Sequence, residues 1–204
     1  VSNLTTMEEL AINYIEGHGF KKRPRSLSED HRFLQSFILP ALGNVKVLHV
    51  TRRDIESLHK HLQDTPYQAN RVLALLSKMF SLAVAWGCRA DNPAIGIPKY
   101  QEEKRDRWLD VEELNRLWGV LDCYSNHLTA YVFKFLILTG ARKGEALGAT
   151  WDQFDLEKGV WTKPSHLTKQ KKKEHLPLSE KALDVLQAVK KLSPHESAYV
   201  FPGR

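Results

Sequence analysis

A continuous helical periodicity between residues 67 and 86 constrains the fold of this chain more than any other feature. Seven apolar residues recur there at the spacing that gathers them on one face of an α-helix: Val72, Leu75, Leu76, Met79, Phe80, Ala83 and Trp86. Gly87 follows, at a position where a left-handed residue commonly ends a helix. The segment therefore predicts a long helix with one buried face.

Three further helix starts precede this segment. In a capping box, a Ser or Thr and an acidic residue three positions later satisfy each other's backbone N–H. We expect such boxes at Thr5/Glu8 and Ser26/Glu29, and Thr51 with Asp54 starts a third helix. Apolar residues follow the last two starts at helical spacing: Phe33, Phe37, Ile38 and Leu42, then Ile55, Leu58 and Leu62. Residues 1–88 are thus predicted to form a four-helix domain.

Residues 89–107 have a different character. Asn92-Pro93 and Gly96-Ile97-Pro98 are turn formers, and residues 101–107 are almost all charged. Such composition is typical of an exposed linker between domains. The sequence therefore predicts a domain boundary here, with a second domain over residues 108–204.

The second domain mixes helices and short strands. Asp110 with Glu113 caps one helix, residues 127–138 form a very apolar and hence buried helix, and a short helix covers residues 142–149. Aromatic and β-branched residues in 151–154, 159–162 and 175–178 predict a small antiparallel sheet. Ser179 caps a last helix whose expected core-facing residues are Leu183, Leu186, Val189 and Leu192. The predicted fold class is mainly α with a small antiparallel β-sheet (α+β).

Composition excludes several classes of protein. The 204 residues are 42% hydrophobic and carry a net charge of +6, which suits a folded protein with a polyanionic partner. The sequence has neither an apolar run long enough to span a bilayer nor the layout of a secretion signal. Two cysteines, Cys88 and Cys123, are too few for a disulfide framework or a zinc site. We therefore expect a cytoplasmic protein with no membrane association, metal or other cofactor.

The segment Thr139-Gly140-Ala141-Arg142-Lys143-Gly144-Glu145 is a candidate oxyanion site. A glycine turn that leads into a helix presents free backbone N–H groups and a positive dipole end. The planar, permanently charged fork of Arg142 suits two phosphate oxygens, and Glu145 lies one turn later, where it can hold the guanidinium. An ordinary surface Arg–Glu pair explains the same spacing.

Two other basic groups and one motif have equally open interpretations. The lysine-rich run 169–173 falls between two predicted strands, where it either enters a DNA groove and supplies a general acid or merely keeps a hairpin tip soluble. Arg71 and Lys78 lie two turns apart on the polar face of the long helix and contact either phosphates or solvent. His49 and Arg52 match H-x-x-R, which we interpret as chance.

In this order, these segments resemble the tyrosine recombinase (phage integrase) family. Residues 70–94 resemble the end of its helical core-binding (SAM-like) domain, and residues 138–147 with Trp151 resemble the box around its first catalytic arginine. Residues 167–179 resemble the hairpin that carries its catalytic lysine, which precedes the proline by eight residues and so selects Lys169 ahead of Pro177. Val200-Phe201-Pro202-Gly203 resembles a later segment.

The resemblance implies DNA strand transfer through a 3′-phosphotyrosyl intermediate, without ATP or metal. Arg142 and Lys169 are the implied catalytic residues, and Glu145 is the residue that orients Arg142. The partner would be double-stranded DNA, on which the full-length protein would form a homotetramer. The expected DNA-contacting residues are Arg71, Lys78, Lys143, Lys171, Lys172 and Lys173.

The sequence departs from the family pattern after residue 204. The family continues with an H-x-x-R box and the nucleophilic tyrosine, which are absent here, and Tyr199 precedes the place where that box belongs. We therefore expect a truncated recombinase, a monomer that binds DNA without cleaving it. A non-catalytic DNA-binding protein, such as a prophage remnant, and a purely structural helical domain remain the alternatives.

Overall fold

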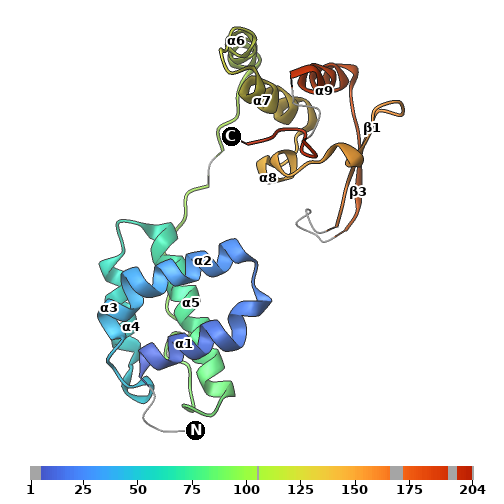
Figure 1. Cartoon of the computed structure of the whole chain (residues 1–204). Coiled ribbons are helices and arrows are strands. Elements are labelled where there is room, and N and C mark those ends of the chain that lie inside the picture. Colours follow the sequence, from blue (N-terminus) through green and yellow to red (C-terminus); the bar gives the residue numbers. More distant parts are fainter. Residues whose placement is uncertain (1–5, 105, 166–171, 193–196, 204) are drawn as a thin grey trace. The chain divides into compact units, whose positions relative to one another are not determined.

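The computed structural model describes residues 6–104, 106–165, 172–192 and 197–203. The chain divides into two compact units, Val1–Arg105 and Asp106–Arg204 (Figure 1). The first is helical and the second carries a small sheet. Each has its own hydrophobic core and is described by itself.

Helices make up the first unit. In chain order its elements are α1 (Met7–His18), η1 (Gly19–Lys21), α2 (Pro24–Phe33), η2 (Leu34–Ile38), α3 (Leu39–Leu42), η3 (Val47–His49), α4 (Arg52–His61) and α5 (Pro66–Ala85). The element η2 is a π-helical turn that leads from α2 into α3. Helix α5 is the helix expected from the long periodicity, and Gly87 after it has a left-handed φ of 71°.

The helix starts agree with the sequence in one case and differ in two. Thr51 and Asp54 form the expected capping box of α4. The box of α1 joins Thr6 to Glu9, one residue later than the expected pair, because the Thr-Thr-Met-Glu-Glu sequence permits both registers; Thr5 lies outside the described residues. Helix α2 begins at Pro24 rather than after Ser26, since proline fits the first helical turn, where its missing N–H costs nothing.

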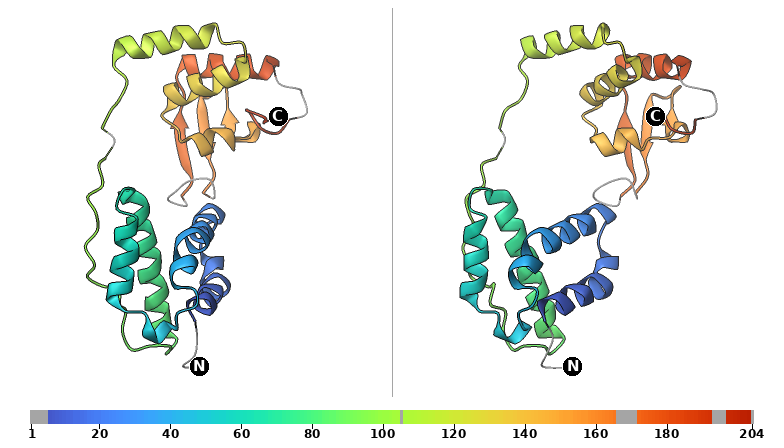
Figure 2. Two further views of the ribbon diagram at one scale, coloured as in Figure 1. Left: turned by 90° about the vertical axis from the view of Figure 1, so that its left-hand side faces the viewer. Right: turned by 60° about the vertical axis from the view of Figure 1, so that its left-hand side comes forward.

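The core of the first unit forms around the apolar face of α5. Helices α1 and α4 both pack against α5, and Figure 2 shows α4 and α5 running side by side. The α5 residues expected to face the core are buried, apart from the half-buried Trp86. From α2 through α3, Phe33, Ile38 and Leu42 are buried and Phe37 is partly buried. Three residues from α4 and its C-cap are buried in the same core: Ile55, Leu58 and Leu62.

The segment expected to be an exposed linker is largely packed on this unit. Ala94 and Ile97 are buried in its core. The side chain of Asn70 in α5 donates to the Tyr100 carbonyl at 2.9 Å and accepts from the Tyr100 N–H at 3.0 Å. The Tyr100 ring stacks on His59, with 4.3 Å between centroids. The first unit therefore extends through residues that were expected to lie in the linker, and the units divide between Arg105 and Asp106.

The second unit begins with helices and then forms a sheet. Its elements are α6 (Val111–Asp122), α7 (His127–Thr139), α8 (Lys143–Leu147), η4 (Trp151–Gln153), β1 (Phe154–Asp155), β2 (Val160–Lys163), β3 (Glu174–Pro177) and α9 (Glu180–Leu192). The three strands are antiparallel in the order β1-β2-β3, with Trp161 opposite Leu176 and Lys163 opposite Glu174. Asp110 and Glu113 form the expected capping box of α6. The predicted fold class is confirmed.

Trp161 lies at the centre of the second core. Its side chain is fully buried, stacks on Phe154 at 5.2 Å and contacts Phe135 of α7 at 5.4 Å between ring centroids. Its indole N–H donates to Gln153 Oε1 at 3.1 Å, so the polar atom is satisfied. Helices α7 and α9 pack together beside the sheet, as Figure 2 shows.

Two burial expectations in this unit were wrong. Helix α7 is not buried all round, because Phe133 is 50% exposed and the described buried residues of the helix are Ala130, Lys134 and Phe135. Leu192 at the end of α9 is 53% exposed, whereas Ala182 and Val185 take core positions. Within the described residues, no helix combines the length and apolarity needed to cross a bilayer.

Replacing Trp161 with alanine tests the importance of this core. We expect Trp161→Ala to lower the free energy of unfolding of the second unit by about 3–5 kcal/mol, since it leaves a large cavity. Trp108→Ala is the matched control, because that indole is 80% exposed and its loss should change stability by no more than about 0.5 kcal/mol. Urea denaturation followed by far-UV circular dichroism measures both, and equal effects would contradict the assignment.

Candidate functional site

Arg142 lies where α7 ends and α8 begins. Gly140 ends α7 in a left-handed conformation with φ of 62°, which residues with a Cβ rarely adopt. The chain turns there, and Arg142 becomes the N-cap residue of α8. Its side chain is 61% exposed, so the guanidinium is accessible to a ligand in solution.

Three backbone N–H groups of this turn already have acceptors, so they do not serve the oxyanion site expected from the sequence. The Gly140 N–H donates to the Leu136 carbonyl at 2.9 Å, and the Ala141 N–H donates to Thr139 Oγ1 at 3.3 Å. The Arg142 N–H donates to Glu145 Oε2 at 3.2 Å. Helix α8 has five residues, so its dipole is small as well. The cationic group that this turn presents to a ligand is therefore the Arg142 side chain.

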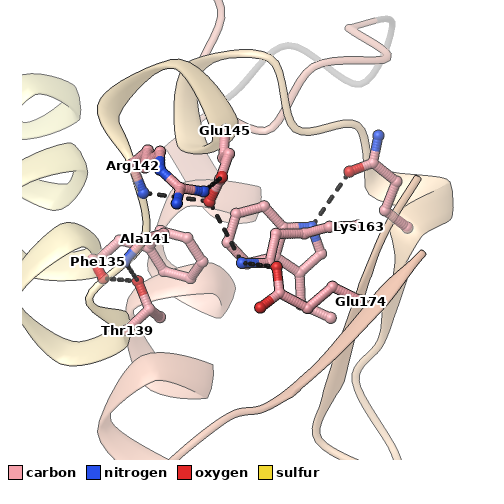
Figure 3. Close-up of polar contacts among 9 residues, drawn as sticks. Phe135, Thr139, Ala141, Arg142, Glu145, Lys163 and Glu174 are labelled. Atoms are coloured by element: carbon pink, nitrogen blue, oxygen red, sulfur yellow. Dashed lines mark hydrogen bonds and ion pairs between the residues drawn. The ribbon is translucent and has the colours of Figure 1, made fainter. Parts of the chain in front are cut away.

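A buried cluster of charges lies behind Arg142 (Figure 3). Glu145 is 4% exposed and accepts from Arg142 Nη1 at 2.5 Å through Oε1. Its other oxygen, Oε2, lies 3.3 Å from Nζ of Lys163, a buried lysine in β2. Lys163 Nζ is also 3.0 Å from Glu174 Oε2 in β3. Arg142 and Lys163 thus share one carboxylate. The sequence analysis expected the contact of Glu145 with Arg142 but not the one with Lys163.

The charge of Glu145 is stabilised by these neighbours. Burial alone would raise the pKa of its carboxyl, because desolvation disfavours the charged form. The hydrogen bonds from the Arg142 guanidinium and backbone, followed by those from Lys163, outweigh burial and hold the pKa below its ordinary value. Glu145 is therefore ionised near neutral pH despite its burial.

The structure describes some of the lysines expected between β2 and β3. Lys169, the expected catalytic lysine, and Lys171 lie outside the described residues. Lys172 and Lys173 are exposed, as is Lys143 in α8. Lys163 was missed from the sequence, although its alternation with Trp161 in a short strand is a signal that places both side chains on the same face of the sheet, and both are buried.

Arg71 and Lys78 of α5 line one pocket of about 650 Å³ in the first unit. Three basic residues that the sequence analysis did not select line it too: Lys22, Arg23 and Arg25. The basic run Lys21-Lys22-Arg23-Pro24-Arg25 was the available signal. Glu29 and Asp30 also line the pocket, so cations outnumber carboxylates in it.

One side of this pocket is fixed by a polar triad. Tyr14 Oη donates to Asp30 Oδ2 at 2.6 Å, and Lys22 Nζ contacts both Tyr14 Oη and Asp30. Burial is the main cause that raises the pKa of Tyr14, and the hydrogen bond to Asp30 adds to it. Lys22 therefore balances Asp30, which leaves Arg71 and Lys78 as exposed cations on the facing helix.

The H-x-x-R match at His49 and Arg52 has a structural explanation. Arg52 forms an ion pair with Glu56 at 2.7 Å and donates to the Gly96 carbonyl at 2.9 Å, so it helps to fasten the segment after α5. In the described part of the chain, no group of three His, Cys, Asp or Glu side chains is placed to hold a metal ion.

The shared carboxylate predicts a pH dependence for the second unit. Because the folded-state pKa of Glu145 is depressed, its contribution to stability is present above the ordinary glutamate pKa and is lost as pH falls through the folded-state value. Glu145→Gln should lower the free energy of unfolding near neutral pH by about 3 kcal/mol, since it leaves Lys163 with one carboxylate. It should also flatten the acid-side loss of stability.

Urea denaturation at neutral and acidic pH measures this effect. Asp155→Asn is the control, because Asp155 also has a lowered pKa, caused by hydrogen bonds from Lys158, but lies at the end of β1 with its side chain 42% exposed. An unchanged acid slope in Glu145→Gln would contradict the interpretation.

Comparison with known proteins identifies the kind of protein that carries this site. Residues 107–204 match the phage integrase family. The chain is 27% identical over 175 residues to the prophage integrase IntZ of Escherichia coli K12, covering 84% of this chain and 43% of that protein. It is 35% identical over 117 residues to a shufflon-specific DNA recombinase of Escherichia coli, covering 56% and 30% of the two chains.

The fold has solved counterparts. A lambda integrase tetramer bound to a Holliday junction superimposes with a TM-score of 0.82 at 17% identity, over 98% of this chain and 60% of that one. The chain spans about half the length, or less, of the curated relatives it matches. The match of the second unit to the phage integrase family and the similarity of the chain to these relatives together support a tyrosine recombinase.

Proposed function

We propose that this chain forms the DNA-binding part and the front of the catalytic site of a site-specific recombinase that cuts and rejoins duplex DNA. The observation that carries the proposal is the exposed Arg142 guanidinium held by the buried, ionised Glu145, within a unit that matches the integrase family. Structural neighbours of the chain include lambda integrase bound to DNA, which supports duplex DNA as the partner here.

Arg142 has the properties required to bind the reacting phosphate. When a nucleophile attacks a phosphodiester, the phosphorane that forms carries additional negative charge on its nonbridging oxygens. A cation fixed in advance stabilises that charge without paying for reorganisation during the reaction. The two hydrogen bonds that Arg142 donates to Glu145, from its backbone N–H and from Nη1, fix Arg142 at its base, while 61% of its side chain stays exposed. Arg142 would thus clamp the nonbridging oxygens.

A lysine of the β2–β3 hairpin would act as the general acid. The 5′-oxygen that leaves is too basic to depart unprotonated near neutral pH, so a proton must be donated to it. Lys163 is unsuited to this role, because its side chain is 6% exposed and both of its neighbours are carboxylates. Lys169 remains the proposed acid on the strength of its spacing from Pro177. Lys143, Lys171, Lys172 and Lys173 would contact the DNA backbone.

The basic pocket of the first unit would bind neighbouring phosphates. Arg71 and Lys78 lie on one exposed face of α5, and Lys22, Arg23 and Arg25 lie across the pocket from them. Such contacts give affinity and register rather than sequence discrimination. In the whole protein, four copies would assemble on DNA, whereas the 204-residue chain would be a monomer.

The covalent step needs a tyrosine that the proposed site does not contain. In this reaction class a tyrosine oxygen attacks the phosphorus, a 3′-phosphotyrosyl bond forms and the bond to the 5′-oxygen breaks. Tyr199 is half exposed, and its backbone pairs with Thr150. It does not match the position of the nucleophile, because the sequence has no H-x-x-R box between Arg142 and Tyr199. The 204-residue chain would therefore bind DNA without cleaving it. A non-catalytic DNA-binding role is the alternative.

Charge reversal at the pocket of the first unit tests DNA binding. We expect the double variant Arg71→Glu/Lys78→Glu to weaken binding and to reduce the slope of log K against log salt concentration by about 1.8, because each lost phosphate contact accounts for about 0.9. Arg53→Glu/Lys60→Glu is the matched control: these exposed residues of α4 have the same spacing and charge change but do not line the pocket. Fluorescence anisotropy with a labelled duplex measures both, and an equal loss in the two variants would reject the pocket.

A nicked suicide substrate tests the covalent step. Built from the DNA that flanks the chain's own gene, it should yield no protein–DNA adduct on a denaturing gel, while a complete tyrosine recombinase with its own site gives one. An adduct that Tyr199→Phe abolishes would make Tyr199 the nucleophile and overturn this part of the proposal. The reading frame beyond codon 204 separates the alternatives, because an H-x-x-R box and a later tyrosine there indicate an enzyme.

A further inference from the structure

Lys163 is a buried cation in the middle of the second unit. It is 5% exposed, and its Nζ lies over the Trp161 ring at 5.2 Å. A lysine without partners in such a place would cost several kcal/mol. Two carboxylates compensate it: Glu174, its partner across the β2–β3 ladder, and Glu145 in α8. The sheet is thereby connected to the helix that follows Arg142 through a single ammonium group.

The geometry divides the charge of Glu145 between two cations. Oε1 faces Arg142 Nη1 and Oε2 faces Lys163 Nζ, as Figure 3 shows. Without Lys163, the full carboxylate charge would turn to Arg142 and largely cancel its guanidinium. With Lys163 in place, Glu145 is shared between two cations, and Lys163 is shared in turn between Glu145 and Glu174, so the four charges balance and Arg142 is the exposed cation among them.

We propose that Lys163 is a positioning residue for Arg142: it holds Glu145 from behind, so that Glu145 fixes the orientation of Arg142 toward a DNA phosphate without being paired to Arg142 alone. This inference rests on the proposed function. Lys163 itself does not contact the phosphate, because its side chain is enclosed. Its effect passes through Glu145, which is the carboxylate common to both cations.

The charged groups around Glu145 come from several elements. Arg142 lies at the start of its own helix, Lys163 comes from β2, and Glu174 of β3 reaches Lys163. From α7, which packs against α8, the buried Lys134 is engaged by Asp122 of α6 at 2.5 Å. Because Lys163 helps to hold the pKa of Glu145 low, its neutralisation should move the titration of this carboxyl toward higher pH.

Variants of the full 204-residue chain test the role of Lys163. Lys163→Gln keeps an amide that can donate to both carboxylates but removes the charge, and Lys163→Met removes both; Lys163→Arg is the conservative rescue. Lys158→Gln is the matched control, because it removes an equal charge from a lysine that is paired with Asp155 in an exposed turn of the same sheet. Arg142→Gln reports on the phosphate site itself.

Two readouts separate positioning from a merely structural role. The first is the salt slope of binding to a short labelled duplex, which should fall by about 0.9 in Lys163→Gln, as in Arg142→Gln. The double variant Arg142→Gln/Lys163→Gln should bind DNA no more weakly than Arg142→Gln alone, because Lys163 acts on binding only through Arg142. The second is the titration of the Glu145 side-chain carbon by NMR, whose midpoint should rise in Lys163→Gln. Lys163→Arg should restore both, and Lys158→Gln should leave the titration unchanged.

Each outcome bears on a different claim. A normal salt slope and an unmoved Glu145 titration in a folded Lys163→Gln would overturn the positioning role, even if the variant were less stable. If Lys163→Met fails to fold, Lys163→Gln still decides the question. If Arg142→Gln binds DNA with an unchanged slope, the proposed phosphate site fails, whereas an effect of Arg142→Gln without one of Lys163→Gln rejects this inference alone.

Discussion

The polar centre of the second unit depends on one buried carboxylate. Glu145 is almost fully enclosed yet ionised, and a charge in such a place must be compensated by partners with good geometry. Two cations supply that compensation from different elements, Arg142 from the turn before α8 and Lys163 from β2. The carboxylate therefore determines how the sheet, the short helix and the exposed guanidinium are placed relative to one another.

Local signals in the sequence predicted most helix boundaries, because the interactions that create them span three or four residues. Asp110 with Glu113 is an example, since the donor and the acceptor of a capping box are close in sequence. Where two local signals compete, the pattern does not decide. Pro24 outweighs Ser26 at the start of α2, and Leu192 continues the apolar spacing of α9 although the helix has by then left the core.

The features that sequence reasoning missed depend on long-range contacts. A lysine in a strand next to a lysine-rich run suggests a solvent-exposed side chain. Lys163 is buried nevertheless, because its charge is compensated by Glu145, eighteen residues away in the sequence. The segment after α5 has the composition of a linker, yet Asn70, thirty residues before Tyr100, holds its backbone. Arg142 and Glu145 were found because they are three residues apart. Two of the N–H groups expected to be free beside them, those of Ala141 and Arg142, donate instead to Thr139 and Glu145.

Stability alone does not explain why the buried Glu145 and Lys163 lie in contact with each other and with the exposed Arg142 and Glu174. Replacing a buried ion pair with apolar side chains of similar volume is often neutral or stabilising by about 1–4 kcal/mol, so aliphatic residues at 145 and 163 would serve the fold at least as well. An aliphatic residue at 145 could not, however, hold the base of an exposed arginine. A lone carboxylate there would cancel the charge of that arginine. The combination of a buried acid with a second, enclosed cation meets both requirements at once, which is what a site that binds a phosphate through Arg142 demands.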